Sequence, residues 1–289
     1  MAMTLDDGSL RLNVDRLGAE MRSLRRADSP VEYLWQGDPA FWDRRAPHLF
    51  PIVGRLKGDT FVHGGKTYTL GQHGFARDRE FAVEGRTATS ATFVLHDDAG
   101  TRSLYPFRFR LTVTYRLAGG GVEIAYEVAN VSGDGMPFSL GAHPGFRCPL
   151  TGGERLQEYV VEFEHAETAN RYPVEGGLVS RRGEPCLNGE NAIPLGPRTF
   201  EGGALVFKEL VSRRARLVSR RSGRGVEVGF EGFPYFGIWS KPGAPFVCLE
   251  PWCGVADPPD ASGRLEDKEA IVCLPPGATF ARTLAIRLL

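Results

Sequence analysis

Residues 107–116 read FRFRLTVTYR and residues 122–128 read VEIAYEV, with three glycines at 119–121 between them. In both runs apolar and polar residues alternate, as expected for β-strands with one buried and one exposed face, because successive side chains of a strand point to opposite faces. The glycines suit a tight turn, since glycine adopts positive φ angles without steric strain. The stretch therefore predicts two strands joined by a glycine turn.

Short alternating runs of this kind recur along the chain. Residues 60–63 and 66–70 flank Gly64-Gly65 and predict a hairpin with a glycine turn. Helix-period patterns are almost absent, apart from one short turn expected at residues 38–43, which opens at Asp38-Pro39. Further strands are expected at residues 91–96, 158–164, 215–220, 225–230, 235–240, 246–250 and 279–288.

The distribution of glycine and proline points to the same fold class. The chain has 289 residues, and its 36 glycines and 20 prolines are spread along the whole length, which leaves little room for long helices. No repeat of fixed period, low-complexity stretch or linker-like change of composition is present. We therefore expect an all-β sandwich or barrel, with residues 1–289 forming a single domain.

Charge and composition limit the classes of partner. Lys plus Arg and Asp plus Glu number 35 each, so no general field attracts nucleic acid or an acidic membrane. A neutral or locally recognised small molecule is the more natural partner. Short basic clusters, such as Arg44 with Arg45, are interpreted as solvated faces, although an anion site built on one of them stays open. Exposed edge strands leave both a monomer and a homodimer open.

Cysteine usage and apolar runs indicate the compartment. Five cysteines stand at positions 148, 186, 248, 253 and 273 without the spacing of a zinc site, so we expect reduced thiols in a cytoplasmic protein and no metal. The first residues show no basic region followed by an apolar run, hence no visible secretion signal. No stretch approaches the ~18 consecutive apolar residues of a membrane helix.

The sequence around three residues is more typical of a catalytic site than of a packed core. They are His73 in QHGFARD, His143 in GAHPGF and Glu250 in VCLEPW. A histidine beside a carboxylate can move protons near pH 7. On a cyclic hemiacetal, a glutamate base and a histidine acid would open the ring and allow the anomeric centre to invert, with no redox cofactor or metal. Nearby aromatic residues, Trp252 and Phe146 among them, offer flat faces for the C–H faces of a sugar.

Four blocks of sequence resemble the aldose 1-epimerase (galactose mutarotase) superfamily, and more closely its LacX-like branch. The blocks are APHLFPIVGRL at 46–56, QHGFARD at 72–78, PFSLGAHPGF at 137–146 and FVCLEPWCG at 246–254. Their order and spacing are similar to those of the family. The resemblance implies a large, twisted antiparallel β-sandwich, the galactose mutarotase-like supersandwich, with few short helices and a sugar cleft on a concave face.

The same resemblance implies roles for individual residues. Glu250 matches the general base and His143 the general acid, while His73 matches a second histidine that hydrogen-bonds sugar oxygens. Arg55 matches a substrate-binding arginine. Arg77 is a further candidate for substrate contact, as are Trp252 and Phe146. No cofactor is implied.

One departure and three alternatives bear on the substrate. Where the family usually has an aspartate that contacts sugar hydroxyls, this chain has Gly202 or Gly203, so galactose or glucose cannot be assumed. A hexose-6-phosphate mutarotase is the nearest rival, with Arg77 and Arg44 or Arg45 holding the phosphate. A non-catalytic carbohydrate-binding protein is another alternative. A glycoside hydrolase is weaker, because it generally needs two positioned carboxylates and only Glu250 is nominated.

Overall fold

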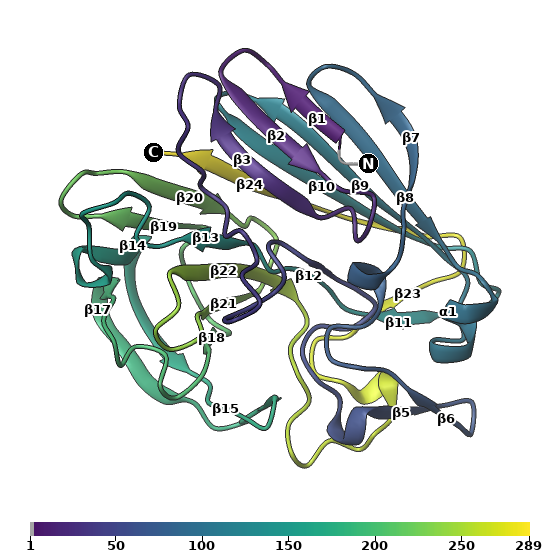
Figure 1. Cartoon of the computed structure of the whole chain (residues 1–289). Coiled ribbons are helices and arrows are strands. Elements are labelled where there is room, and N and C mark those ends of the chain that lie inside the picture. Colours follow the sequence, from purple (N-terminus) through teal and green to yellow (C-terminus); the bar gives the residue numbers. More distant parts are fainter. Residues whose placement is uncertain (1–2) are drawn as a thin grey trace.

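The computed structural model describes residues 3–289, and nearly all of its regular structure is β-strand (Figure 1). The strands are β1 Met3–Asp6, β2 Leu10–Val14, β3 Met21–Arg26, β4 His48–Leu49, β5 Thr60–His63, β6 Lys66–Thr69, β7 Ala82–Arg86, β8 Ser90–His96, β9 Phe109–Ala118, β10 Gly121–Asn130, β11 Met136–Phe138, β12 Leu140–Ala142, β13 Gly145–Arg147, β14 Tyr159–Arg171, β15 Val174–Glu175, β16 Leu178–Val179, β17 Glu184–Pro194, β18 Leu205–Phe207, β19 Arg214–Ser219, β20 Gly225–Gly229, β21 Tyr235–Trp239, β22 Phe246–Cys253, β23 Val272–Leu274 and β24 Thr279–Leu288. The helical segments are α1 Ala99–Leu104 and the 3-10 turns η1 Lys57–Asp59, η2 Ala76–Asp78, η3 Leu156–Glu158 and η4 Leu265–Asp267.

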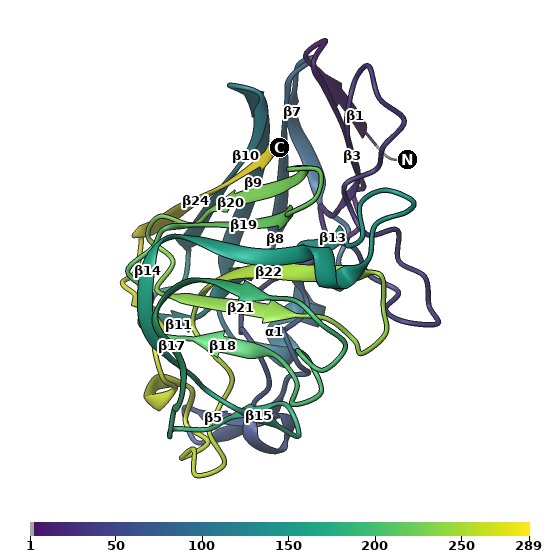
Figure 2. The same ribbon diagram turned by 90° about the vertical axis from the view of Figure 1, so that its left-hand side faces the viewer.

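The largest sheet has nine antiparallel strands, in the order β17-β14-β19-β20-β24-β10-β9-β8-β7. The hairpin of β9 and β10 confirms the two strands and glycine turn predicted at residues 107–128, with Ala118 opposite Gly121. Alternate residues of β9 are buried, as the sequence pattern predicts. Figures 1 and 2 show that the sheet is strongly twisted.

A second sheet packs against the large one. Its strands run in the order β18-β21-β22-β12-β4, and β13 also pairs with β22. Phe163 of β14 contacts the rings of Phe207 on β18 and Phe236 on β21, with ring centroids 6.0 and 6.4 Å apart, so aromatic side chains fill the space between the sheets. Every residue of β22 is buried. The predicted antiparallel β-sandwich with few short helices is confirmed.

A buried histidine links the two sheets. His48 lies on β4, and its Nδ1 is 2.9 Å from the hydroxyl of Tyr126 on β10. Its Nε2 is 2.8 Å from the hydroxyl of Tyr115 on β9, which donates to the carbonyl of Ala19. Burial lowers the pKa of His48 to about 4, so the ring is neutral and serves as a hydrogen-bonded part of the core.

Some elements were not predicted from the sequence. The helix α1 begins after Asp98, whose carboxylate accepts a hydrogen bond from the Thr101 N–H while the Thr101 hydroxyl accepts from the Asp98 N–H. The sheet β1-β2-β3 and strand β17 were also missed.

The short turn expected after Asp38 is present, since the N–H groups of Phe41 and Trp42 both donate to the Asp38 carbonyl. All five cysteines are free, as predicted.

No helix among residues 3–289 is both long and apolar enough to cross a membrane.

The centre of the large sheet gives a stability prediction. Ile124 is 1% exposed and lies on β10, which pairs with β9 and β24. Ile124→Ala should lower the free energy of unfolding by about 2–5 kcal/mol, because it removes buried methyl groups and leaves a cavity. Chemical denaturation measures the change. The exposed neighbour Glu123 is the control: Glu123→Ala should change stability by no more than about 0.5 kcal/mol. Equal losses of stability in the two variants would contradict the placement of Ile124 on the buried face of β10 and of Glu123 on its exposed face.

Candidate active site

Strand β22 carries the candidate base and the aromatic wall beside it. Residues two apart on a strand share a face. Cys248, Glu250 and Trp252 therefore share one face of β22, and Glu250 is only 2% exposed. The side chains on the other face of β22 belong to the main core; they include Val247, Leu249 and Cys253. A strand buried on both faces thus places one carboxyl group among apolar side chains.

Two glycines make room for the indole of Trp252. Gly141 on β12 and Gly237 on β21 lie on the strands that flank β22. A Cβ atom at Gly141 would lie 2.7 Å from Cδ1 of Trp252, and one at Gly237 would lie 2.5 Å from its Cη2. Both distances are shorter than real Cβ contacts, so the ring lies across the two glycines in a position that any side chain would block.

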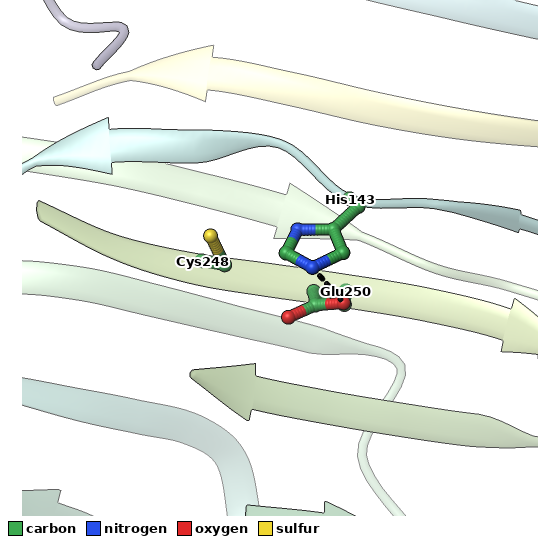
Figure 3. Close-up of side chains that lie close together, drawn as sticks. All are labelled: His143, Cys248 and Glu250. Atoms are coloured by element: carbon green, nitrogen blue, oxygen red, sulfur yellow. Dashed lines mark ion pairs between the residues drawn. The ribbon is translucent and has the colours of Figure 1, made fainter. Parts of the chain in front are cut away.

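His143 follows β12 and is held directly beside Glu250. Its backbone N–H donates to the Pro47 carbonyl, 3.0 Å away. The imidazole packs against Trp42, with centroids 4.9 Å apart, and meets the edge of Trp239 at 5.6 Å. Nε2 of His143 lies 3.1 Å from Oε2 of Glu250, as Figure 3 shows. The candidate acid and base, far apart in sequence, therefore form one pair.

His73 lies in the turn that precedes η2, and its ring lies beside the pair. Its φ angle is +67°, an uncommon value for a residue with a side chain, and such angles persist where the surrounding structure enforces them. Gly54 enforces this one, because its N–H donates to Nδ1 of His73 at 3.1 Å while its carbonyl accepts from the His73 N–H at 2.8 Å. Since Nδ1 accepts, the proton of the neutral ring lies on Nε2. The ring stands edge-on to His143 at 5.6 Å.

Burial sets the protonation of these groups. Removal from water raises the pKa of Glu250 well above its ordinary value and lowers the pKa of His143 to about 3. The pKa of His73 also lies well below its ordinary value, because of burial first and the nearby His143 and Arg77 second. The uncharged forms are favoured throughout, so the His143–Glu250 pair holds one proton between its two partners over a wide pH range.

These residues open onto a cavity of about 340 Å³. Its walls combine indole rings, small apolar residues and a few polar groups, the composition of a small-molecule site. The lining residues are Trp42, Gly54, Gln72, His73, Arg77, His143, Val174, Gly177, Val179, Gly203, Ala204, Val206, Trp239, Glu250, Trp252 and Ala256.

Comparison with known proteins gives the family. The model of the aldose 1-epimerase family matches residues 1–287. This chain belongs to that family. It is 33% identical to protein LacX of Lactococcus lactis subsp. lactis over 299 residues, which covers 100% of both chains, and this places it in the LacX-like branch.

Solved structures agree with this membership. A galactose mutarotase related enzyme from Lactobacillus acidophilus is 36% identical, with a TM-score of 0.96 over 100% of this chain and 97% of the other. A galactose mutarotase-like protein from Lactobacillus casei is 31% identical, with a TM-score of 0.92 over 100% of both chains. The antiparallel supersandwich expected from the aldose 1-epimerase resemblance is therefore the fold of this chain.

Five of the predicted site residues come together at the cavity: His73, Arg77, His143, Glu250 and Trp252. The Nη2 of Arg77 donates to the Gln72 carbonyl at 2.6 Å, whereas its buried Nε has no hydrogen-bond partner among residues 3–289. Burial, reinforced by the charge of Arg44, lowers the pKa of Arg77 to about 10, so the guanidinium remains charged at neutral pH.

Arg55 and Phe146 are placed elsewhere. The guanidinium of Arg55 forms two hydrogen bonds with Asp59, at 2.8 and 2.6 Å, and a third with the Gly176 carbonyl in the turn between β15 and β16. It holds that turn at the edge of the cavity but does not line it. Phe146 is 1% exposed and packs in the main core, because its side chain leaves β13 on the side away from the cavity. The predicted sugar contact of Phe146 therefore does not fit its position.

Sequence reasoning missed several cavity residues. Trp42 and Trp239 supply the aromatic surface that Phe146 was expected to supply. Trp239 lies in a predicted strand, but alternation does not distinguish a cavity wall from a core face. Gly203 also lines the cavity, and it is one of the two glycines at the place where the family usually has an aspartate, so backbone rather than a carboxylate lines the cavity there.

The burial of the two histidines gives a spectroscopic prediction. His73 and His143 should remain uncharged as the pH falls below 6.5, because an imidazole with a lowered pKa takes up its proton only in more acidic solution. Nitrogen NMR of the ring atoms, followed between about pH 5 and 8, measures this directly. His73 should show the proton on Nε2. The same protein unfolded in urea is the reference, and a folded His73 that titrates like the unfolded one would contradict the assignment.

Proposed function

We propose that this protein is an aldose 1-epimerase that interconverts the α and β anomers of a free aldose. The observation that carries the proposal is the buried pair of Glu250 and His143, with Oε2 and Nε2 3.1 Å apart in a cavity lined by indole rings. Residues 1–289 would act as one domain, since the main core cluster includes residues of both large sheets.

The spacing of the pair suits the two oxygens that must exchange protons. In an aldose ring the anomeric hydroxyl and the ring oxygen are both bonded to C1. An acid and a base within hydrogen-bond distance of each other can therefore address both oxygens at once. In the proposed step the proton that the pair shares moves from Glu250 to His143 when the sugar binds between them. The Glu250 carboxylate then removes the hydroxyl proton while His143 donates to the ring oxygen, and the bond from C1 to that oxygen breaks.

The remaining steps restore the enzyme. The open chain carries an aldehyde, which rotates about the bond between C1 and C2. The hydroxyl at the far end of the former ring then attacks the other face of the aldehyde, returns its proton to His143, and the new anomeric oxygen takes one from Glu250. The pair holds one proton before and after the cycle, in accord with the shared proton expected from its burial.

Other residues would bind the sugar and polarise it. The Nε2–H of His73 would donate to a sugar oxygen, because its Nδ1 is occupied by the Gly54 N–H. The indole ring of Trp252 lines the cavity and would lie against the sugar. The rings of Trp42 and Trp239 would cover the C–H face.

A hexose 6-phosphate is the second candidate substrate. Its support is Arg77, whose charged guanidinium lines the cavity, with Nε 3.8 Å from Oδ2 of Asp78. Arg44 lies nearby but is held by Asp78, with Nη2 and Oδ1 2.8 Å apart. A phosphate bound at this wall would accept hydrogen bonds from the guanidinium of Arg77, and the positive charge of Arg44 would lie nearby.

The central test removes the base. Glu250→Gln should lower the enzymatic rate of anomer exchange about 10²–10⁴-fold, because the amide cannot accept the hydroxyl proton. Exchange NMR or polarimetry on fresh α-glucose, α-galactose and glucose 6-phosphate measures the rate over the spontaneous background. Glu227→Gln, a glutamate with similar burial that pairs with Arg216 on the large sheet, is the matched control and should retain the rate. Full activity in Glu250→Gln would sink the proposed chemistry.

A separate variant decides between the substrates. Arg77→Ala should raise KM for glucose 6-phosphate by about ten- to hundredfold, the worth of a charged hydrogen bond, if phosphate is bound at this wall. The KM for unphosphorylated glucose should change less. Arg181→Ala, at an exposed arginine paired with Asp260, serves as the control. A phosphate preference that survives Arg77→Ala would count against this role of Arg77.

A further inference from the structure

A third side chain with a metal-binding atom lies beside the proposed acid and base. Cys248 stands two residues before Glu250 on β22, so its thiol is on the same face of the strand as the carboxylate. The donor atoms of His143, Cys248 and Glu250 all lie within 4.8 Å of one another, and all three residues are buried. Figure 3 shows the thiol and the carboxylate side by side along β22, with the imidazole close to both.

The donor set matches a particular class of ion. Thiolate, imidazole and carboxylate together favour zinc or a similar borderline-soft divalent cation over magnesium or calcium, which prefer oxygen ligands. Two ligands at about 2.1 Å from a tetrahedral zinc ion are about 3.4 Å apart. The 3.1 Å between Nε2 of His143 and Oε2 of Glu250 is close to that value. Only the thiol has to move inward to complete three ligands.

Charge balance favours such an ion in this buried place. A thiolate, a carboxylate and a neutral imidazole around a divalent cation have no net charge, which limits the cost of burying them. Burial raises the pKa of the Cys248 thiol well above its ordinary value, so metal binding has to displace its proton. The affinity should therefore increase with pH, and protons should be released on binding.

The cavity gives the ion a route. His143 and Glu250 line it, so an ion can arrive from the side where the sugar would bind, while the Cys248 thiol, which does not line the cavity, lies close to Gly145. Three protein ligands would leave the fourth position of a tetrahedral ion open toward the cavity. Nδ1 of His143 has no hydrogen-bond partner among residues 3–289, so the ring lacks the hydrogen bond that usually supports a metal-bound histidine, and the affinity should be moderate.

We propose that His143, Cys248 and Glu250 form an inhibitory site for zinc and chemically similar divalent cations. The bound ion would occupy both atoms that move protons in the sugar reaction and would stop anomer exchange. The inhibition rests on the proposed function, whereas the binding of the ion does not.

Calorimetry with zinc chloride tests the binding. The reference protein carries Cys186→Ser and Cys273→Ser, which remove the two thiols that are not fully buried. It should bind one zinc ion per chain, with proton release and with affinity that increases with pH. Absorption of the cobalt-substituted protein should show a thiolate–metal band. Cys248→Ala in this background should weaken binding by at least about tenfold.

A matched variant separates the site from general thiol effects. Cys253 lies on the same strand but faces the main core, with its thiol near the Gly232 carbonyl. Cys253→Ala should bind zinc like the reference protein. Circular dichroism establishes that each variant is folded, and Cys248→Ser, whose hydroxyl is a poor zinc ligand, replaces Cys248→Ala if the alanine variant does not fold.

Rate measurements test the inhibition. Zinc should suppress anomer exchange in the reference protein, and EDTA should restore it. Cys248→Ala should retain the uninhibited rate and require at least about tenfold more zinc for the same suppression. Equal zinc affinity with and without the Cys248 thiol, or no stoichiometric binding at all, would overturn the proposal. If zinc binds through Cys248 but no variant exchanges anomers, the metal site stands and the proposed function fails.

Discussion

The burial of one carboxyl group in strand β22 governs the chemistry of this protein. Every residue of β22 is buried, and Glu250 lies among indole rings and small apolar side chains. A charge isolated there would be costly, so the carboxyl group is paired with His143 and the two share one proton. The same burial thus keeps one shared proton on the proposed acid and base over a wide pH range.

The surrounding structure is arranged to support that pair. Gly141 and Gly237 admit the Trp252 ring, the Pro47 carbonyl fixes the backbone of His143, and Gly54 fixes the tautomer of His73. These contacts are made by backbone atoms or by the absence of a side chain. Pro47, Gly54 and Gly141 stand in the sequence blocks that resemble the family, so glycine and proline in those blocks set the geometry around the proposed acid and base.

The fold was predictable where the local pattern was strong. The alternation of residues 107–128 predicted β9 and β10, because a strand with one buried face imposes that pattern. The sheet β1-β2-β3 was not predicted because its strands have only 4, 5 and 6 residues and each carries a short alternation. Helix α1 was not predicted either, although Asp98 and Thr101 carry a capping signal. In the site, the family blocks brought His73, His143 and Glu250 to one cavity, but membership of the same block as His143 misled for Phe146, whose side chain packs in the main core. Trp42 and Trp239 could not be assigned, because the cavity they line is made by tertiary packing.

The position of β24 has a consequence for how the molecule is assembled. β24 lies between β20 and β10, so one strand joins the group β17-β14-β19-β20 to the group β10-β9-β8-β7. Both groups precede it in the order of synthesis. Neither can become part of a continuous nine-stranded sheet until residues 279–288 have left the ribosome, and until then each exposes a long unpaired edge. Completion of the large sheet is therefore a late step of folding, which follows the synthesis of all the strands on either side of β24.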